Sequence, residues 1–250
     1  MNDISAPRSG RHVPRVYFET PLADGSAAVI CGVKHHHLRN VLRLAVGDAV
    51  IAFDGAGGEL PARIEAVTRD RTTVILSERS YPAREPTLRI TLAQAVIGGA
   101  RMDQALARAV ELGVCALQPV TTARSRLHQA AAHNKREHWQ RVAVAAAEQS
   151  GRERVPEVRA PKALADLLEG LPHGLRLVLQ PDAAATPGAL APTDQVLLLT
   201  GPESGWTAQE LEQIQSHGFT ALRMGPRVLR AETAGPACLA VLQALWGDFR

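Results

Sequence analysis

Two short segments near the C-terminus have residue types and spacing that suit a ligand-binding site. The first, LLTGPESG at residues 198–205, directly follows an apolar run and precedes Thr207 and Glu210, which have the spacing of a helix capping box. The second, MGPRVLRAETA at residues 224–234, contains two arginines and a glutamate and ends near Thr233, a candidate helix N-cap. Each segment alone could be an ordinary turn. Together they favour a site, because strand-to-helix junctions expose backbone amides and carbonyls to a ligand.

Other candidate motifs favour structural roles. The three consecutive histidines at residues 35–37 cannot converge on one metal ion, because successive helical side chains point about 100° apart. The glycine-rich run DGAGGE at residues 54–59 is followed by an alternating run at 60–67, which favours a hairpin turn over a nucleotide-binding loop. Cys31, Cys115 and Cys238 match no paired metal spacing and are interpreted as reduced core thiols. No metal site is expected.

Composition places the chain among globular proteins. Of 250 residues, 46% are hydrophobic and 21% charged, which excludes wholesale disorder. No apolar run reaches the roughly 18 residues that cross a bilayer, and the first residues lack the apolar core of a signal peptide, so a cytoplasmic protein is expected.

The charged residues point to a polyanionic partner. The net charge is only +3, but 25 of the 28 basic residues are arginine, the side chain best suited to phosphates and base edges. A GC-rich genome, which enriches both arginine and alanine, would explain the high arginine content equally well. The formal charge is +4 over residues 101–160, −5 over 161–222 and +2 over 223–250, so the basic surface is regional. Aromatic residues, at 4%, are too sparse for a module built on stacked bases.

Periodicity predicts two domains, one at residues 1–82 and one at 83–250. In the first, strands are expected at residues 15–18, 27–30, 48–54, 60–67 and 72–76, with one helix at 35–44 that buries Leu38, Val41 and Leu42 and carries Arg39 and Arg43 on its polar face. This pattern is typical of a small β-barrel. Two prolines within YPAREP at residues 81–86 mark the boundary.

The second domain is expected to be α/β with a largely parallel sheet. Strands are predicted at residues 88–97, 114–120, 175–179 and 196–200, and helices at 135–149, 207–216 and 233–246, with a further helix around Met102, Leu106 and Val110. The last helix is apolar around most of its circumference, which indicates burial in its own core or against a second subunit.

The GPESG and RMGPRVLRAETA segments resemble the cofactor-binding loops of the SPOUT methyltransferases, and specifically of the RsmE family, which methylates ring nitrogen 3 of a uridine in small-subunit ribosomal RNA. The resemblance extends over nearly the whole chain, through PRVYF at residues 14–18, HHHLRNVLRLAVGD at 35–48, ARMDQALARAVELGV at 100–114 and AAEQSGRERVP at 146–156, with Pro119, Arg124 and Ser125 also in register. Several independent motifs in one order make the resemblance specific.

This resemblance implies a PUA-like, RNA-binding β-barrel followed by a SPOUT methyltransferase domain with a C-terminal trefoil knot, S-adenosylmethionine as cofactor, and a homodimer that completes the active site. The cofactor-binding residues that it implies are Leu179, Thr200, Gly201, Pro202, Glu203, Gly205, Met224, Gly225, Arg227, Val228, Leu229, Arg230, Glu232, Thr233 and Ala234. Residues 179–181 as a whole form a third candidate contact.

Three positions depart from the family pattern. Ser204 replaces a glycine that is usual in the GPEGG motif, which raises the question of how closely the backbone approaches the cofactor. Gly98 and Arg108 stand where lysines are common; the first loses a charge and the second keeps it.

Methyl transfer to a uridine nitrogen requires an aligned donor and acceptor and removal of a proton. Arg230 and Glu232 are the candidate catalytic residues, Arg230 for electrostatic support and Glu232 as a proton acceptor. Glu232 could equally bind backbone amides. The candidate RNA-binding residues are Arg15, Arg39, Arg43, Arg124 and Arg152, or else these arginines form a solvated face.

Two other functions stay open at this point. One is a non-catalytic RNA-binding or ribosome-assembly factor, which Ser204 alone favours. The other is a SPOUT methyltransferase that acts on another RNA.

Overall fold

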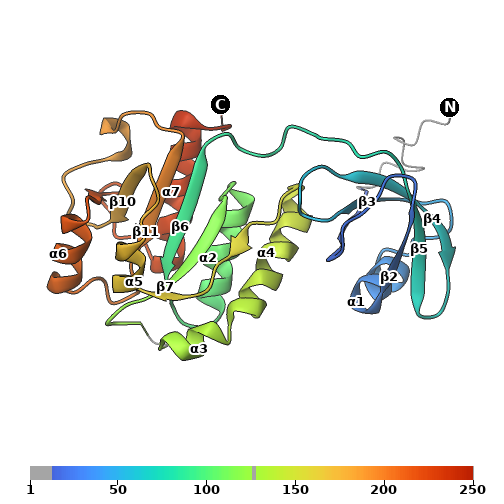
Figure 1. Ribbon diagram of the computed structural model, residues 1–250, viewed down its shortest axis with the longest axis horizontal. Helices are drawn as coiled ribbons and strands as arrows, with labels where there is room; N and C mark the ends of the chain where they lie inside the picture. Colours follow the sequence, from blue (N-terminus) through green and yellow to red (C-terminus); the bar gives the residue numbers. More distant parts are fainter. Residues whose placement is uncertain (1–12, 126–127, 250) are drawn as a thin grey trace. The chain divides into compact units, whose positions relative to one another are not determined.

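The chain forms two compact units. The computed structural model describes residues 13–125 and 128–249, so the start of the predicted first domain, residues 1–12, lies outside the described residues (Figure 1). Within them, one unit extends to Glu85 and also includes Ala147–Val155, and the other comprises Pro86–Ala146 and the chain from Pro156 onward. The contiguous division predicted at residues 82 and 83 therefore differs from the structure in one respect, because residues 147–155 belong with the first unit.

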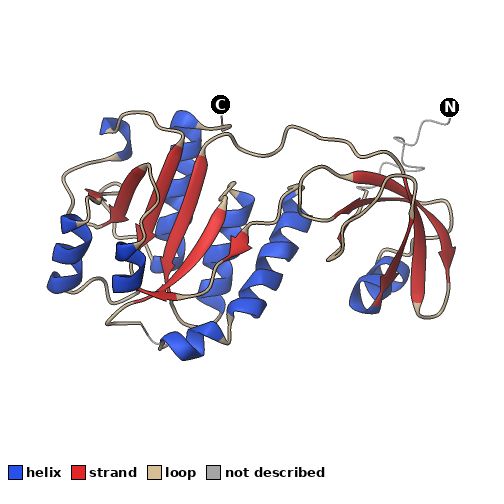
Figure 2. Ribbon diagram, viewed as in Figure 1, coloured by secondary structure: helices blue, strands red, loops and turns tan. Residues whose placement is uncertain are grey.

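The first unit is built on a five-stranded sheet (Figure 2). Its strands are β1 (Arg15–Tyr17), β2 (Ala27–Cys31), β3 (Ala49–Phe53), β4 (Leu60–Val67) and β5 (Arg71–Leu76), in the order β1-β3-β4-β5-β2. Only β1 and β3 pair in parallel. The five predicted strands are confirmed within one or two residues. The described pairings do not join β1 to β2, so the sheet is not closed into the full ring expected of a barrel.

Apolar side chains alternate with exposed ones along these strands, and the apolar ones form the core of the first unit. Ile30, Val50, Ile64 and Val74 point inward from four strands and pack with Leu38. Their outward neighbours are largely exposed or half-buried, as a half-buried sheet requires. Residues 54–59 connect the antiparallel strands β3 and β4, so the predicted hairpin turn is confirmed.

The predicted helix at residues 35–44 lies earlier and is irregular. An α-helical turn, α1 (Gly32–His36), continues into a π-helical turn, η1 (His37–Val41). A π-turn contains an extra residue, which rotates the following side chains. Leu38 is buried as predicted, but Val41 is 59% exposed. Arg43 lies beyond the helix with a φ of +55°, so Arg39 and Arg43 do not share a helical face.

Two of the structural interpretations of single residues can be compared with the fold. His35 is buried, and its Nδ1 lies 2.9 Å from the Thr72 hydroxyl, so it is a core residue. Cys238 is a buried core thiol, and burial raises its pKa to about 12. The same prediction is wrong for Cys31, which is exposed on the edge strand β2.

The second unit contains a seven-stranded sheet in which every described pair is parallel, which confirms the α/β prediction. The strands are β6 (Arg89–Ala95), β7 (Ala116–Thr121), β8 (Glu157–Val158), β9 (Lys162–Ala163), β10 (Leu175–Leu179), β11 (Gln195–Thr200) and β12 (Thr220–Leu222). Their order is β12-β10-β11-β6-β7-β8, with β9 also paired to β7.

Helices cover both faces of this sheet (Figure 1). They are α2 (Ala100–Glu111), α3 (Gln129–His133), α4 (Arg136–Ser150), α5 (Leu164–Glu169), α6 (Ala208–Ser216) and α7 (Ala231–Trp246), with a short 3-10 turn at Pro187–Ala189. Helices α5 and α6 pack on the face that carries Ala93, Leu197 and Leu199. Helix α7 packs against α2 and against β6 and β11.

The start of α7 corrects one prediction. Its N-cap is Arg230, with an extended backbone, and the helix begins at Ala231. Thr233 is therefore not an N-cap but lies inside the first turn, where its amide donates to the carbonyl of Arg230. Within the described residues, none of the helices has the length and apolar character needed to cross a membrane.

Candidate functional site

The carboxyl ends of β10, β11 and β12 lead into three loops that surround a cavity of about 500 Å³. Residues 179–181 lie at the end of β10, residues 201–206 follow β11 and residues 223–230 follow β12. The first turn of α7, Arg101 of α2, Leu211 of α6 and Leu222 of β12 also line the cavity. Open parallel sheets bind ligands at this position, outside the carboxyl ends of the strands. The fold therefore brings both glycine-containing segments to one site.

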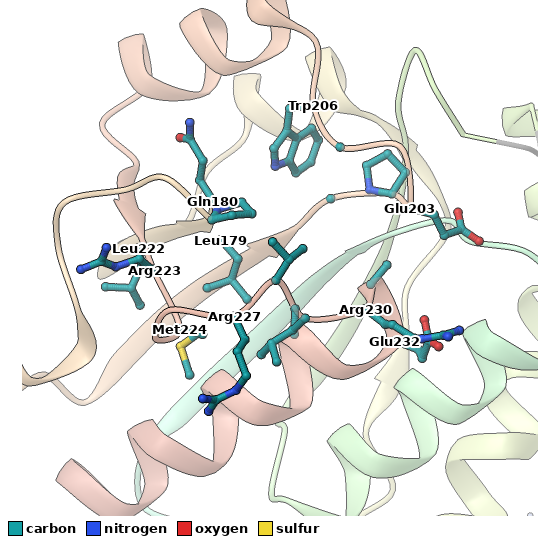
Figure 3. A pocket seen from close by; sticks show the side chains of 18 of the residues that line it. Leu179, Gln180, Glu203, Trp206, Leu222, Arg223, Met224, Arg227, Arg230 and Glu232 are labelled. Atoms are coloured by element: carbon teal, nitrogen blue, oxygen red, sulfur yellow. The ribbon is translucent and has the colours of Figure 1, made fainter.

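The cavity carries its two acidic side chains on one side. Figure 3 shows Glu203, Arg230 and Glu232 gathered there, while Leu179 and Met224 lie toward the other side together with the polar side chains of Gln180, Arg223 and Arg227. Arg230 is exposed, whereas Glu232 is only 7% exposed and belongs to the first turn of α7. A carboxylate in a first helical turn is favoured by the helix dipole, so Glu232 has a structural reason for its position as well as access to the cavity.

The loop at residues 201–206 forms a compact wall of the cavity. The amide of Gly205 donates to the carbonyl of Pro202 at 2.9 Å, which closes a turn. Trp206 folds back over Gly201, where an added Cβ would lie 3.0 Å from two atoms of the indole ring. A side chain at position 201 would therefore force the indole to shift by a few tenths of an ångström.

The backbone at Ser204 does not require a glycine. The left-handed conformation in this turn belongs to Gly205, with a φ of +70°, and Ser204 is not among the described residues of positive φ. Ser204 is exposed, and its side chain is tolerated without strain.

Glu203 ties this loop to the start of α2. Its Oε1 lies 3.2 Å from the Arg101 guanidinium and accepts a hydrogen bond from the amide of Gly98 at 3.3 Å. Glu203 therefore holds the loop in place as well as lining the cavity.

All of the residues predicted to bind a cofactor line this cavity except Thr200 and Thr233. Thr200 is buried at the end of β11, where its hydroxyl donates to Oε1 of Gln94 at 2.7 Å. Thr233 lies within α7. Lining residues that the motif resemblance missed include Arg101, Trp206, Leu222 and Arg223. Trp206 adjoins the GPESG motif, but Arg101 is remote in sequence and only the fold reveals it.

Comparisons with known proteins agree with this architecture. The family model described as an RNA methyltransferase domain matches residues 83–243, and the one described as an RNA methyltransferase PUA domain matches residues 35–77. A protein from Synechocystis, named ribosomal RNA small subunit methyltransferase E, is 36% identical over 84% of this chain and 70% of its own length. The chain belongs to the ribosomal RNA small subunit methyltransferase E family.

Solved structures of similar proteins agree. A ribosomal RNA small subunit methyltransferase E from Neisseria gonorrhoeae, bound to S-adenosylmethionine, has a TM-score of 0.89 and 35% identity, and the match covers 96% of this chain and all of that one. A methyltransferase from Legionella pneumophila, in complex with the same cofactor, also has a TM-score of 0.89, with 32% identity over 95% of this chain and 100% of its own.

In this member of the methyltransferase E family, two of the five predicted RNA-contacting arginines are buried. The Arg15 side chain is 5% exposed, pairs with Glu59 and donates to the carbonyl of Arg152 at 2.9 Å. The Arg152 side chain is 6% exposed and pairs with Glu85 at 2.6 Å. Both guanidinium groups are held inside the first unit by carboxylates, so neither presents the exposed charge that was expected for a phosphate contact.

The other three arginines are exposed. Arg39 donates from Nη1 to the carbonyls of Thr68 and Arg69, at 2.9 and 3.1 Å, and Arg43 is exposed just beyond η1. Arg124 donates to the carbonyl of Ser204. In this family member, Arg39 and Arg43 of the first unit remain candidates for RNA contact.

Proposed function

We propose that this protein is an S-adenosylmethionine-dependent methyltransferase that methylates ring nitrogen 3 of a uridine in small-subunit ribosomal RNA. The observation that carries the proposal is the single cavity lined by both C-terminal loops, in a chain of the methyltransferase E family. The neighbour bound to S-adenosylmethionine covers nearly the whole of this chain, which supports the same cofactor here.

The residues present fit this cofactor. A cavity of about 500 Å³ lies within the range of about 300–1,000 Å³ that is common for cofactor sites. Leu179 and Met224 supply apolar surface that suits a planar base, and the open space beside Gly225 lets a ligand approach the backbone closely. The carboxylate of Glu232 suits the positive charge of a sulfonium or an amino group.

When bound, the cofactor supplies an electrophilic methyl group, so the chain must align the acceptor and remove its proton. The N3 proton of uridine lies on the Watson–Crick edge, and the base must be unpaired to react. Arg230 is proposed to stabilise negative charge on the base, and its exposure at the cavity supports this role. Glu232, beside it, is the candidate proton acceptor.

We also infer that the C-terminal stretch is threaded as a trefoil knot and that two chains form the active unit. The knot is supported by the path of the chain, which leaves the edge strand β12 and returns in α7 to pack on β6 and β11. The homodimer is supported by Val228, 78% exposed at the cavity, and by Phe249, 47% exposed near the C-terminus. A sedimentation mass equal to one chain of 26.8 kDa would contradict the dimer.

The first unit is proposed to bind RNA, because a PUA domain model matches it and because Arg39 and Arg43 are exposed there. A cytoplasmic location is proposed with it, since ribosomal RNA is the substrate. The proposed partner is small-subunit ribosomal RNA or the assembled subunit.

The deciding experiment is nucleoside mass spectrometry of ribosomal RNA from a strain that lacks this protein. The 3-methyluridine signal should be lost, return with the wild-type gene, and stay absent with Gly201→Val, whose side chain would collide with Trp206 in the cavity wall. An unchanged signal in the deletion strain would point to another RNA. If the Gly201→Val gene restores the 3-methyluridine signal although calorimetry shows that this variant binds no cofactor, a non-catalytic role is favoured.

A further inference from the structure

The cavity wall at residues 201–206 depends on contacts from outside itself. It contains no helix or strand, yet it contributes Gly201, Pro202, Glu203, Gly205 and Trp206 to the lining. A loop of this kind loses conformational entropy when it adopts one shape, so its order must be stabilised by its neighbours.

The loop that follows β7 supplies two of these contacts from consecutive residues. Arg124 donates from Nη1 to the carbonyl of Ser204 at 2.8 Å and, at 3.4 Å, to that of Trp206. These two carbonyls flank Gly205, the residue with the left-handed backbone. One guanidinium therefore holds both sides of the turn in the cavity wall.

The adjacent residue anchors the end of the same wall. The amide of Ala123 donates to Oε1 of Glu210 at 2.8 Å. The other carboxylate oxygen of Glu210 accepts from the amide and hydroxyl of Thr207, which completes the capping box of α6. The wall is thus fixed to the β7 loop along its second half, while Glu203 fixes its first half to α2.

The charge of Arg124 has no carboxylate partner within 4.0 Å among residues 13–125 and 128–249. The carbonyls of the cavity wall are the partners that the structure shows for it. Both bonds come from Nη1, which the planar guanidinium holds in a fixed orientation, whereas the lysine ammonium rotates freely on a stem of different reach. The identity of the side chain should therefore matter, and not only its charge.

We infer that Arg124 is a positioning residue for the cofactor site: it shapes the cavity wall through the carbonyls of Ser204 and Trp206 rather than contacting RNA phosphates. The inference rests on the proposed function, because the ligand of the cavity is taken to be S-adenosylmethionine.

The test compares Arg124→Ala, Arg124→Lys and a matched control, Arg141→Ala, which removes an exposed arginine of α4 outside the cavity lining. Calorimetry without RNA measures the Kd for S-adenosylmethionine, and steady-state assays separate KM from kcat. Arg124→Ala should raise the Kd and the KM for the cofactor about tenfold, equal to about 1.4 kcal/mol, with the RNA Kd unchanged. The Kd of Arg124→Lys for the cofactor should lie between those of the wild type and Arg124→Ala. Added ethylguanidinium should restore cofactor binding to Arg124→Ala only.

Each other outcome overturns the inference in a recognisable way. An unchanged cofactor Kd with weaker RNA binding would return Arg124 to the phosphate contacts. A cofactor defect that ethylguanidinium does not restore, together with a lowered Tm, would indicate a general folding defect instead of positioning. A wild-type chain that does not bind S-adenosylmethionine would overturn the proposed function and this inference with it.

Discussion

At the scale of single residues, Glu232 has two competing roles that one substitution separates. As a proton acceptor it must be ionised, so Glu232→Gln should lower kcat by about 10²–10⁴ and abolish the acidic limb of the pH–rate profile. As a partner of the α7 N-terminus it should mainly lower stability, by about 0.3–1 kcal/mol. The measurement is kcat against pH, with Glu212→Gln on the exposed face of α6 as control. A profile of unchanged shape rules out the base role.

The same scale shows how far residue types predict a site. The two loops were predicted because their glycines, arginines and glutamates lie close together in sequence, and the fold places nearly all of them around one cavity. The roles of the arginines were harder to predict, because the sequence does not distinguish an arginine that binds phosphate from one that pairs with a buried carboxylate. The partners of Arg15 and Arg152, Glu59 and Glu85, lie 44 and 67 residues away.

At the scale of elements, Asp54 of the β3–β4 turn forms an ion pair with Arg79, which lies beyond β5, and this pair has a clear pH signature. Burial would raise the pKa of Asp54, but hydrogen bonds from Arg79 and from the amides of Leu22 and Ala56 outweigh burial and hold the pKa below its ordinary value. A lowered folded-state pKa gives stability that is present above the unfolded value, about 3.9, and is lost as pH falls through the folded value.

Asp54→Asn should therefore lower the free energy of unfolding at neutral pH by about 1–3 kcal/mol and flatten its further loss in acid. Urea denaturation between neutral and acidic pH measures both effects. Glu65→Gln, at an exposed position on β4 in the same unit, is the matched control. An acid limb as steep in Asp54→Asn as in the wild type would contradict the assignment.

Elements were predictable where local signals were strong. The capping box of Thr207 and Glu210 and the buried positions Met102, Leu106 and Val110 are all confirmed. The short helices α3 and α5 were missed, because five or six residues are too few to establish a period. The π-turn after His36 was missed because an extra residue in a turn leaves no local signature.

At the scale of the whole molecule, the division of the chain depends on contacts that no local pattern reveals. Residues 147–155, with the sequence AEQSGRERV, have the pattern of a helix end and a loop of the second domain, yet they belong to the first unit. Glu153 accepts from the amide of Gly58 at 2.9 Å, and Glu148 pairs with Lys34 at 2.9 Å. These charged residues are therefore structural parts of the first unit.

The exposed arginines of the first unit should then govern the electrostatic part of RNA binding. Each phosphate contact contributes roughly 0.7–0.9 to the slope of log K against log salt concentration, so Arg39→Ala/Arg43→Ala should reduce that slope by about one to two. Arg39→Lys/Arg43→Lys keeps both charges and should keep the slope, and neither double variant should alter cofactor binding, because neither residue lines the cavity. Filter binding of small-subunit ribosomal RNA over a salt series measures the slope. The same slope in the alanine variant and the wild type would place the RNA-binding surface elsewhere on the molecule, since an arginine that neutralises no phosphate releases no counterion.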